Sequence, residues 1–536
     1  MAHLTFSSRR SGVLARHGMV ATSQPLAAMA GLRVLMDGGN AADAAVTVAA
    51  MLNVVEPMST GIGGDCFALI YQAATGQVTA LNASGRAPAA FSLQEAQRRG
   101  LAAIPLTGPL PVTVPGTVSG WTALLERFGS VPLARCLAPA IAAADEGFPV
   151  SERISAGWQN SAEKLSRDVE ATRVYLPAPR PGQVHRQPDL GRTLRLLAAG
   201  GAAAFYRGPL AERIAACVQS NGGYLAASDL AGHTATWEQA IRTTYRGVEV
   251  VEHPPNGQGL AALLALNIVQ GLQLQEMDYY CIERWHALIE AVRLGMADAA
   301  GYVADPAFSP VPVAGLLSKQ YAAGRRALIR PSRAMALAMP GRPDAHPGHQ
   351  DTVYLTVVDG QGNAVSFINS LYYGFGSGLV VPGTGICLQN RGACFTLEPG
   401  HPNALAGGKR PYHTIIPAMA LREGRLWLSF GVMGGFMQPQ GHLQVVVNMV
   451  DHGLDPQAAL DAPRFRVDER GGPQVAIETA VPLATRRGLS AMGHHVQPEP
   501  TFSPGFGGGQ VIAVDPETGV LWGGSDPRKD GCAVGF

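Results

Sequence analysis

A proline-rich segment divides this chain into two parts of different character. Four prolines lie in "RPSRAMALAMPGRPDAHPGHQD", and no helical or strand period continues after Met339. Such a composition is typical of an exposed connection that forms no core element of its own. We therefore expect a larger part, residues 1–351, that ends in a mobile linker, residues 331–351, and a smaller part, residues 352–536.

Helical patterns dominate the first part, and strand patterns dominate the second. "QPLAAMAGLRVLMDGGNAADAAVTVAAMLNVV" is typical of two Ala-rich helices broken at Gly38-Gly39, and "GIGGDCFALIYQAATGQVTALNAS" of a strand, a turn and a second strand. After the linker, "TVYLTVVD" and "NAVSFINSLY" predict a hairpin, and "HTIIPAMALREGRLWLSFGV" and "QVIAVDPETGVLWGGSD" predict two more. The order of elements indicates an α+β protein.

The composition excludes several classes of protein. The net charge is +1 in 536 residues, so nothing favours a nucleic-acid or acidic-membrane partner. The seven cysteines are odd in number and contain no C-x-x-C pair, which argues against a disulfide framework and a thiolate zinc site. The N-terminus lacks the apolar core of a signal peptide, and the longest apolar run, 41–55, is too short to span a bilayer. These features predict a cytoplasmic protein.

Thr352 is the first residue of the strand that follows the linker. In an N-terminal nucleophile hydrolase a precursor cuts itself before such a residue, which then supplies a hydroxyl nucleophile and its own α-amine, of pKa about 7.7–8.0, as the base. The β-methyl group of threonine also restricts χ1 and holds the hydroxyl in place. A β-branched residue that simply begins an ordinary strand is the alternative that the local sequence leaves open.

Ordered motifs extend along nearly the whole chain. They are "GMVATSQPLAAMAGLRVLMDGGNAADAAVTVAAMLNVVEP", "GIGGDCFALIY", "VTVPGTVSGWTALLERFGSVPL", "DTVYLTVVDGQGNAVSF", "GFGSG", "GTGICLQN", "GGKRPYHTIIPAM" and "DAPRFRV". In this order and spacing they resemble the γ-glutamyltransferase (glutathione hydrolase) family.

The resemblance implies a fold and a processing event. The fold is the four-layer αββα sandwich of N-terminal nucleophile hydrolases. The cut falls between Asp351 and Thr352, and the two subunits stay together as a heterodimer; whether two heterodimers pair is left open. The family's second threonine corresponds to Ser370, and its oxyanion-hole glycines correspond to Gly434-Gly435. The resemblance implies a small-molecule amide substrate, no metal and no organic cofactor.

The chain departs from the family at the substrate pocket. The arginine that binds the α-carboxylate of a glutamyl group is replaced by Ser84, with Arg86 nearby, and the acid that pairs with its α-ammonium is replaced by Cys394. Arg391 replaces a glutamine, and Tyr372 replaces an asparagine that contacts substrate. The residues that the resemblance implies for substrate binding are Arg86, Tyr372, Asn390, Arg391, His413 and Thr414.

These departures favour one substrate class. An added arginine and a missing acid favour a carboxylate and give an α-ammonium no partner. "GICLQNRGACF" and "FGVMGGFMQPQGH" resemble most the branch that includes oxamate amidohydrolase, and cephalosporin-acylase-like members less. We therefore expect hydrolysis of a small carboxylate-bearing amide, of the oxamate type, through an acyl-enzyme. The alternatives are a γ-glutamyltransferase or glutathione hydrolase, transfer to an amine acceptor, and a binding protein without activity.

Other motifs predict no site. His494-His495 and the linker pair His346 and His349 lack the local spacing of metal ligands. "GFGGG" precedes a strand, whereas a dinucleotide loop follows one. Lys409 is interpreted as a loop anchor.

Overall fold

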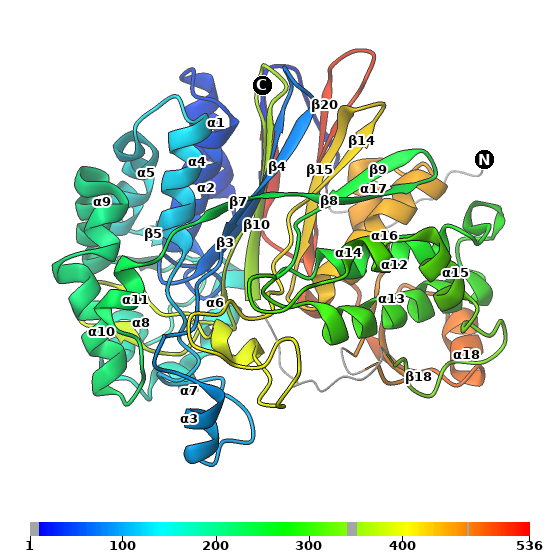
Figure 1. The fold of residues 1–536 in the computed structure, drawn as a ribbon. Helices are drawn as coiled ribbons and strands as arrows, with labels where there is room; N and C mark the ends of the chain where they lie inside the picture. Colours follow the sequence, from blue (N-terminus) through cyan, green and yellow to red (C-terminus); the bar gives the residue numbers. More distant parts are fainter. Residues whose placement is uncertain (1–9, 340–350, 469–470) are drawn as a thin grey trace.

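The computed structural model describes residues 10–339, 351–468 and 471–536, and two antiparallel sheets lie at its centre (Figure 1). The first sheet has the strand order β21 (Cys532–Gly535), β2 (Met19–Thr22), β10 (Asp351–Val358), β11 (Ala364–Tyr372), β3 (Asp65–Gln72), β4 (Gln77–Ala83) and β7 (Thr236–Gln239). The second has the order β1 (Val13–Ala15), β20 (Leu521–Ser525), β19 (Gly508–Val514), β15 (Arg425–Met433), β14 (Ala418–Arg422), β9 (Val248–Glu252) and β8 (Ile241–Tyr245). Both sheets therefore combine strands from the two sides of the linker.

The sheets pack face to face through small and branched side chains. Met19 and Leu69 of the first sheet meet Val251 and Ile512 of the second in one buried cluster. Tyr354 of β10 packs against the backbone of β15, where a Cβ atom on Gly431 would lie 2.5 Å from the tyrosine ring. The close approach of these two strands brings the start of β10 near the end of β15.

A helical layer covers the outer face of each sheet (Figure 1). The layer on the first sheet contains α1 (Pro25–Met36), α2 (Ala41–Val55), α4 (Thr117–Phe128), α5 (Leu133–Glu146), α9 (Pro188–Tyr206) and α10 (Pro209–Ser220). The layer on the second sheet contains α12 (Gly259–Val269), α13 (Ile282–Tyr302) and α16 (Met437–Asp451). The expected αββα sandwich is confirmed.

The Ala-rich sequence of α2 explains its central place. All its residues are buried, and Asn40 and Asp43 form a capping box at its N-terminus. A Cβ atom on Gly31 of α1 would lie 2.3 Å from Val48, so α1 and α2 approach closely. The predicted break between these two helices is present, and the three predicted hairpins are present as β10–β11, β14–β15 and β19–β20.

Shorter elements complete the described fold. The helices are α3 (Leu93–Arg98), α6 (Glu152–Gln159), α7 (Ala162–Leu165), α8 (Val169–Tyr175), α11 (Ala227–Ala231), α14 (Val313–Leu316), α15 (Lys319–Arg326), α17 (Pro456–Asp461) and α18 (Leu483–Ala491). The strands are β5 (Phe148–Pro149), β6 (Val184–His185), β12 (Val380–Val381), β13 (Ile386–Cys387), β16 (Phe465–Val467), β17 (Gln474–Glu478) and β18 (His495–Glu499). Within residues 10–339, 351–468 and 471–536, no helix combines the length and apolar character needed to cross a membrane.

The expected linker begins with a docked stretch. Ala334 donates its N–H to the carbonyl of Met492, and Ala338, which is fully buried, donates to the carbonyl of Gly471. Residues 340–350, with His346 and His349, lie outside the described residues. The mobility of the linker and the division at residue 352 stay predictions.

Candidate active site

The Thr352 hydroxyl lies at the start of β10, next to a register shift between Asp351 and Val353. Thr352 is almost completely buried, and its Oγ1 is 3.2 Å from the Oγ of Ser370 on the neighbouring strand β11. Ser370 Oγ also accepts the N–H of Tyr372 at 2.8 Å. The sheet therefore holds the hydroxyl of the predicted nucleophile against a second, fixed hydroxyl.

Arg391 lies directly beside this pair and is completely buried. Its Nη2 points to Ser370 Oγ at 3.4 Å, and its Nη1 donates to Thr414 Oγ1 at 2.7 Å. The guanidinium also lies over the ring of Tyr372, 4.2 Å from the centroid. Among the described residues no carboxylate lies within ion-pair distance of it, and its Nε has no hydrogen-bond partner. Four predicted site residues, Ser370, Tyr372, Arg391 and Thr414, thus meet in one cluster with Thr352.

A buried acid, Asp65, lies at the start of β3, opposite Ser370 in the sheet. Asp65 accepts N–H groups from the backbone of Gly85 and Gly116 and from the side chain of Gln389. Burial raises the pKa of Asp65 to about 7, although the charge of Arg391 and these hydrogen bonds lower it.

His413 is the partner of Asp65 on the other side. Its Nδ1 accepts the N–H of Ile415, so its Nε2 carries the proton that it donates to Asp65 Oδ2 at 3.1 Å. Burial, reinforced by the charge of Arg391, holds the pKa of His413 well below its usual range. The structure therefore places His413 behind the cluster, where it contacts an acid of the protein.

Gly434 and Gly435 form a turn between β15 and α16. Both have positive φ, +119° and +60°, and a Cβ atom on Gly434 would lie 3.1 Å from the Cα of Gly507. Such a turn points successive N–H groups to one side and suits an anion. Within the described residues neither N–H donates a hydrogen bond.

Gln258 connects this turn to the arginine cluster. Its Nε2 donates to the carbonyl of Thr414 at 2.6 Å and to the carbonyl of Gly435 at 2.8 Å, and its Oε1 accepts the hydroxyl of Tyr412. The side chain is completely buried. One amide group thus fixes the distance between the glycine turn and the Arg391 side of the site.

Two predicted substrate residues have other surroundings. Asn390 accepts the N–H of Tyr373 and donates to the carbonyl of Leu106, so it holds the loop after β11. Arg86 lies 3.6 Å from the carboxylate of Asp305, and none of its contacts is with Thr352, Ser370 or Arg391. The substrate roles of both residues stay predictions.

Two cavities lie near the site and share Phe436, and of the cluster residues only Tyr372 lines one of them. The smaller, ≈ 470 Å³, is lined by Tyr372, Cys394 and Tyr412. The larger, ≈ 710 Å³, is lined by Gly434 and Tyr373. Among the described residues its lining carries no acidic side chain and five basic ones, Arg153, Lys164, Arg466, Arg528 and Lys529.

Sequence reasoning missed Asp65, Gln258 and Gln389. The sequence does contain an indication of Asp65, because it directly precedes the apolar strand "CFALIY". Burial of a carboxylate at such a position costs free energy unless the fold provides hydrogen-bond partners for it. No local pattern predicts the roles of Gln258 and Gln389, because their hydrogen-bond partners lie far away in the chain.

Comparisons with known proteins cover the whole chain. The glutathione hydrolase-like YwrD proenzyme of Bacillus subtilis is 38% identical, over 98% of this chain and 99% of that protein. The oxamate amidohydrolase proenzyme of Klebsiella pneumoniae is 36% identical, over 98% and 100%. The crystal structure of a cephalosporin acylase from Bacillus halodurans superposes with a TM-score of 0.92 at 45% identity, over 100% and 99%.

These identities change one expectation. The cephalosporin acylase is at least as similar to this chain as the oxamate amidohydrolase is, so acylases are not the weaker match that the motifs suggested. The relatives are hydrolases that are named as proenzymes or share the N-terminal nucleophile hydrolase fold, and the chain is an amide hydrolase of this type. A sequence model described as gamma-glutamyltranspeptidase matches residues 27–536, and the chain therefore belongs to the gamma-glutamyltranspeptidase family.

Proposed function

We propose that this protein cuts itself between Asp351 and Thr352 and then hydrolyses amides whose acyl group carries a carboxylate and no α-ammonium. The observation that carries the proposal is the position of Arg391, a buried guanidinium without a carboxylate partner among the described residues, beside the Thr352–Ser370 hydroxyl pair. A substrate carboxylate there makes charge-assisted hydrogen bonds, which contribute about 1.5–3 kcal/mol each.

The chemistry uses groups of this chain alone. The α-amine that the cut releases at Thr352 takes the proton from Oγ1 as this oxygen attacks the amide carbonyl carbon. The N–H groups of Gly434 and Gly435 donate to the oxyanion. The ammonium then gives its proton to the leaving nitrogen as the C–N bond breaks, leaving an ester on Thr352. Water then adds to the ester carbonyl carbon, and the bond between this carbon and Oγ1 breaks. The carboxylic acid leaves the site, and Oγ1 regains its proton.

The altered pocket supports the preference against an α-ammonium. Cys394 lies 3.9 Å from Nη1 of Arg391, and burial raises the pKa of its thiol, so this position offers a neutral group where an acid would pair with the ammonium. An ammonium buried there without a partner costs at least about 1–3 kcal/mol. Oxamate is the smallest substrate of the proposed class.

The larger cavity supports a second candidate, an acylase that takes a longer carboxylate-bearing acyl group. Its volume of ≈ 710 Å³ lies within the range of about 300–1,000 Å³ that accommodates drug-sized ligands. Arg466 and Arg528 in its lining are already paired with acids of the protein. Arg153 and Lys529 form no ion pair within the described residues, and these two cations favour an anion. Oxamate would leave most of this space empty, whereas a dicarboxylic monoamide such as a glutaryl amide would occupy more of it.

A matched pair of chromogenic substrates tests the proposal. Glutaryl-p-nitroanilide and γ-glutamyl-p-nitroanilide differ only by the α-ammonium. We expect kcat/KM for the glutaryl compound to be higher by roughly 10–10²-fold, the equivalent of one unpaired buried ammonium. Equal or faster turnover of the γ-glutamyl compound would refute the proposed selectivity. Ammonia release from oxamate, compared with glutaryl turnover, decides between the two candidate acyl groups.

A further inference from the structure

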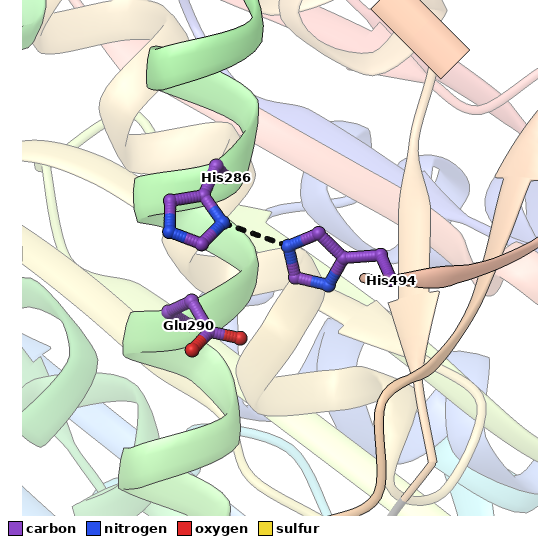
Figure 2. A group of neighbouring side chains, drawn as sticks. All are labelled: His286, Glu290 and His494. Carbon is purple, nitrogen blue, oxygen red and sulfur yellow. Dashed lines mark hydrogen bonds between the residues drawn. The ribbon is translucent and has the colours of Figure 1, made fainter. Parts of the chain in front are cut away.

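Three buried side chains with metal-binding atoms meet far from Thr352 in the chain. His286 and Glu290 are four residues apart on one face of α13, and His494 comes from the loop between α18 and β18 (Figure 2). His286 Nδ1 is 2.8 Å from His494 Nε2, and one donor atom from each of the three residues lies within 4.8 Å of the others. The amide hydrolase chemistry described above uses none of them.

The surrounding backbone orients two of these side chains. His286 Nε2 donates to the carbonyl of Arg330 at 2.8 Å, so its Nδ1 is the nitrogen that faces His494 with a lone pair. Glu290 accepts the N–H of Met335 at 2.9 Å on one oxygen and pairs with Arg293 through the other. Each carboxylate oxygen has two lone pairs, so both keep the capacity to bind an ion.

The second ring nitrogen of His494 lets this side chain change tautomer when an ion binds. If it donates through Nε2 to His286, its Nδ1 is a bare acceptor, and within the described residues this buried atom has no hydrogen-bond partner. Two imidazoles and a carboxylate form a donor set that suits a first-row divalent ion such as Zn²⁺ and leaves a fourth position open. Donor atoms about 2.0–2.1 Å from a common ion lie roughly 3.3 Å apart, so the two nitrogens need to separate by only a few tenths of an ångström.

We propose that His286, Glu290 and His494 bind a divalent cation of the zinc type. Binding of the ion to Nε2 of His494 moves the proton of that nitrogen to the bare Nδ1, and protonation of either imidazole weakens binding as the pH falls. The ion links α13 and the His494 loop under the docked stretch that carries Arg330 and Met335. If the chain is cut before Thr352, the ion also joins the two subunits; this consequence rests on the proposed function, whereas ion binding itself does not.

Metal analysis of the purified protein tests the proposal. Because the three side chains are buried, the protein is produced in zinc-supplemented medium, so that the ion enters during folding, and is purified without a chelator or a metal-affinity column. Elemental mass spectrometry is expected to find about one zinc per chain in the wild type and in the control variant His495→Ala, whose side chain is exposed. His286→Ala and His494→Ala are expected to bind zinc at least ~10-fold more weakly, since changes to groups behind a ligand alone cost about 10–100-fold.

Two further measurements keep the test decisive. Glu290→Gln preserves the shape of the side chain and removes its charge, and in Co²⁺-grown protein it is expected to change the visible absorption of the ion. The variant Thr352→Ala, which is expected to stay uncut, should hold zinc equally well, which separates this proposal from the proposed processing. Zinc below about 0.1 per chain in the wild type, or equal zinc in His494→Ala, would show that the cluster is a metal-free hydrogen-bonded pair and overturn the proposal.

Discussion

Two completely buried arginines of this protein have opposite surroundings. Arg528 donates to Glu478 at 2.9 Å and to Asp526 at 3.1 Å, so acids of the protein neutralise its charge. Arg391 donates to the hydroxyl groups of Ser370 and Thr414, and among the described residues no acid lies within ion-pair distance. A buried charge without a counter-ion is costly, which supports the proposal that a substrate carboxylate pairs with Arg391.

The pKa values of two buried aspartates, one near each arginine, differ in the same sense. Burial raises the pKa of Asp526, but Arg464 and Arg528 outweigh this effect and hold it below its ordinary value. Burial also raises the pKa of Asp65, and the charge of Arg391 only partly opposes it, so the value is about 7. We call the Arg528 region closed, because acids of the protein pair with its cation, and the Arg391 region open, because no acid among the described residues does so.

The largest effect is expected at the open region, from Thr352→Ala. Without the hydroxyl neither self-cleavage nor acyl transfer can start, so denaturing electrophoresis should show one chain and amide hydrolysis should be undetectable. The matched control is Thr356→Ala on the same strand, whose hydroxyl bonds Ser429 and whose loss should leave two chains. A Thr352→Ala protein that still separates into two chains would contradict this prediction.

Arg528→Met tests the closed region. It leaves Glu478 and Asp526 buried without their shared cation, which is expected to lower the free energy of unfolding by about 3–5 kcal/mol. Denaturant titration measures this loss. A loss below about 1 kcal/mol would mean that the two arginines do not differ as described.

The raised pKa of Asp65 should make the free energy of unfolding depend on pH. Its pKa in the folded protein, about 7, lies above its ordinary 3.8, so the unfolded chain releases this proton at lower pH and the folded state loses stability as the pH rises from about 4 to 7. Relative to Asp65→Asn, the wild type should lose at most about 4 kcal/mol across this window. Unfolding curves at several pH values check this, and a constant difference between the two proteins would contradict it.

Arg391→Met should affect selectivity more than stability. We expect kcat/KM for glutaryl-p-nitroanilide to fall by about 10–10²-fold, while that for the uncharged butyryl-p-nitroanilide changes little. Arg391→Lys should be intermediate, because an ammonium keeps the charge and loses the planar fork. An equal fall in kcat/KM for both anilides would show that Arg391 stabilises the structure of the site and does not bind the substrate carboxylate.

Local patterns were sufficient to predict much of the fold. The alternation of Val353, Leu355 and Val357 predicted the β10–β11 hairpin, and the Ala-rich runs predicted α1 and α2. The resemblance to the family pointed to Thr352 and Ser370, and the hairpin register brings these hydroxyls within 3.2 Å.

Contacts between distant segments were beyond sequence reasoning. Gln258 meets Gly435, and His286 meets His494, only because the helical layer over the second sheet packs segments from both sides of the linker together. Spacing along the chain predicted no metal site at His494-His495, because the side chains that lie beside His494, His286 and Glu290, come from a distant helix. Arg86 was proposed from its position near Ser84, and its contact with Asp305 depends on loop packing that no local pattern encodes.

The most direct test of the proposed self-cleavage and acyl-enzyme is intact-mass spectrometry. The denatured protein is measured before and just after it is mixed with glutaryl-p-nitroanilide. The proposed mechanism predicts two chains, the smaller beginning at Thr352, and a transient glutaryl adduct on that first residue. An uncut chain that turns over the substrate, or an adduct on any other residue, would contradict it.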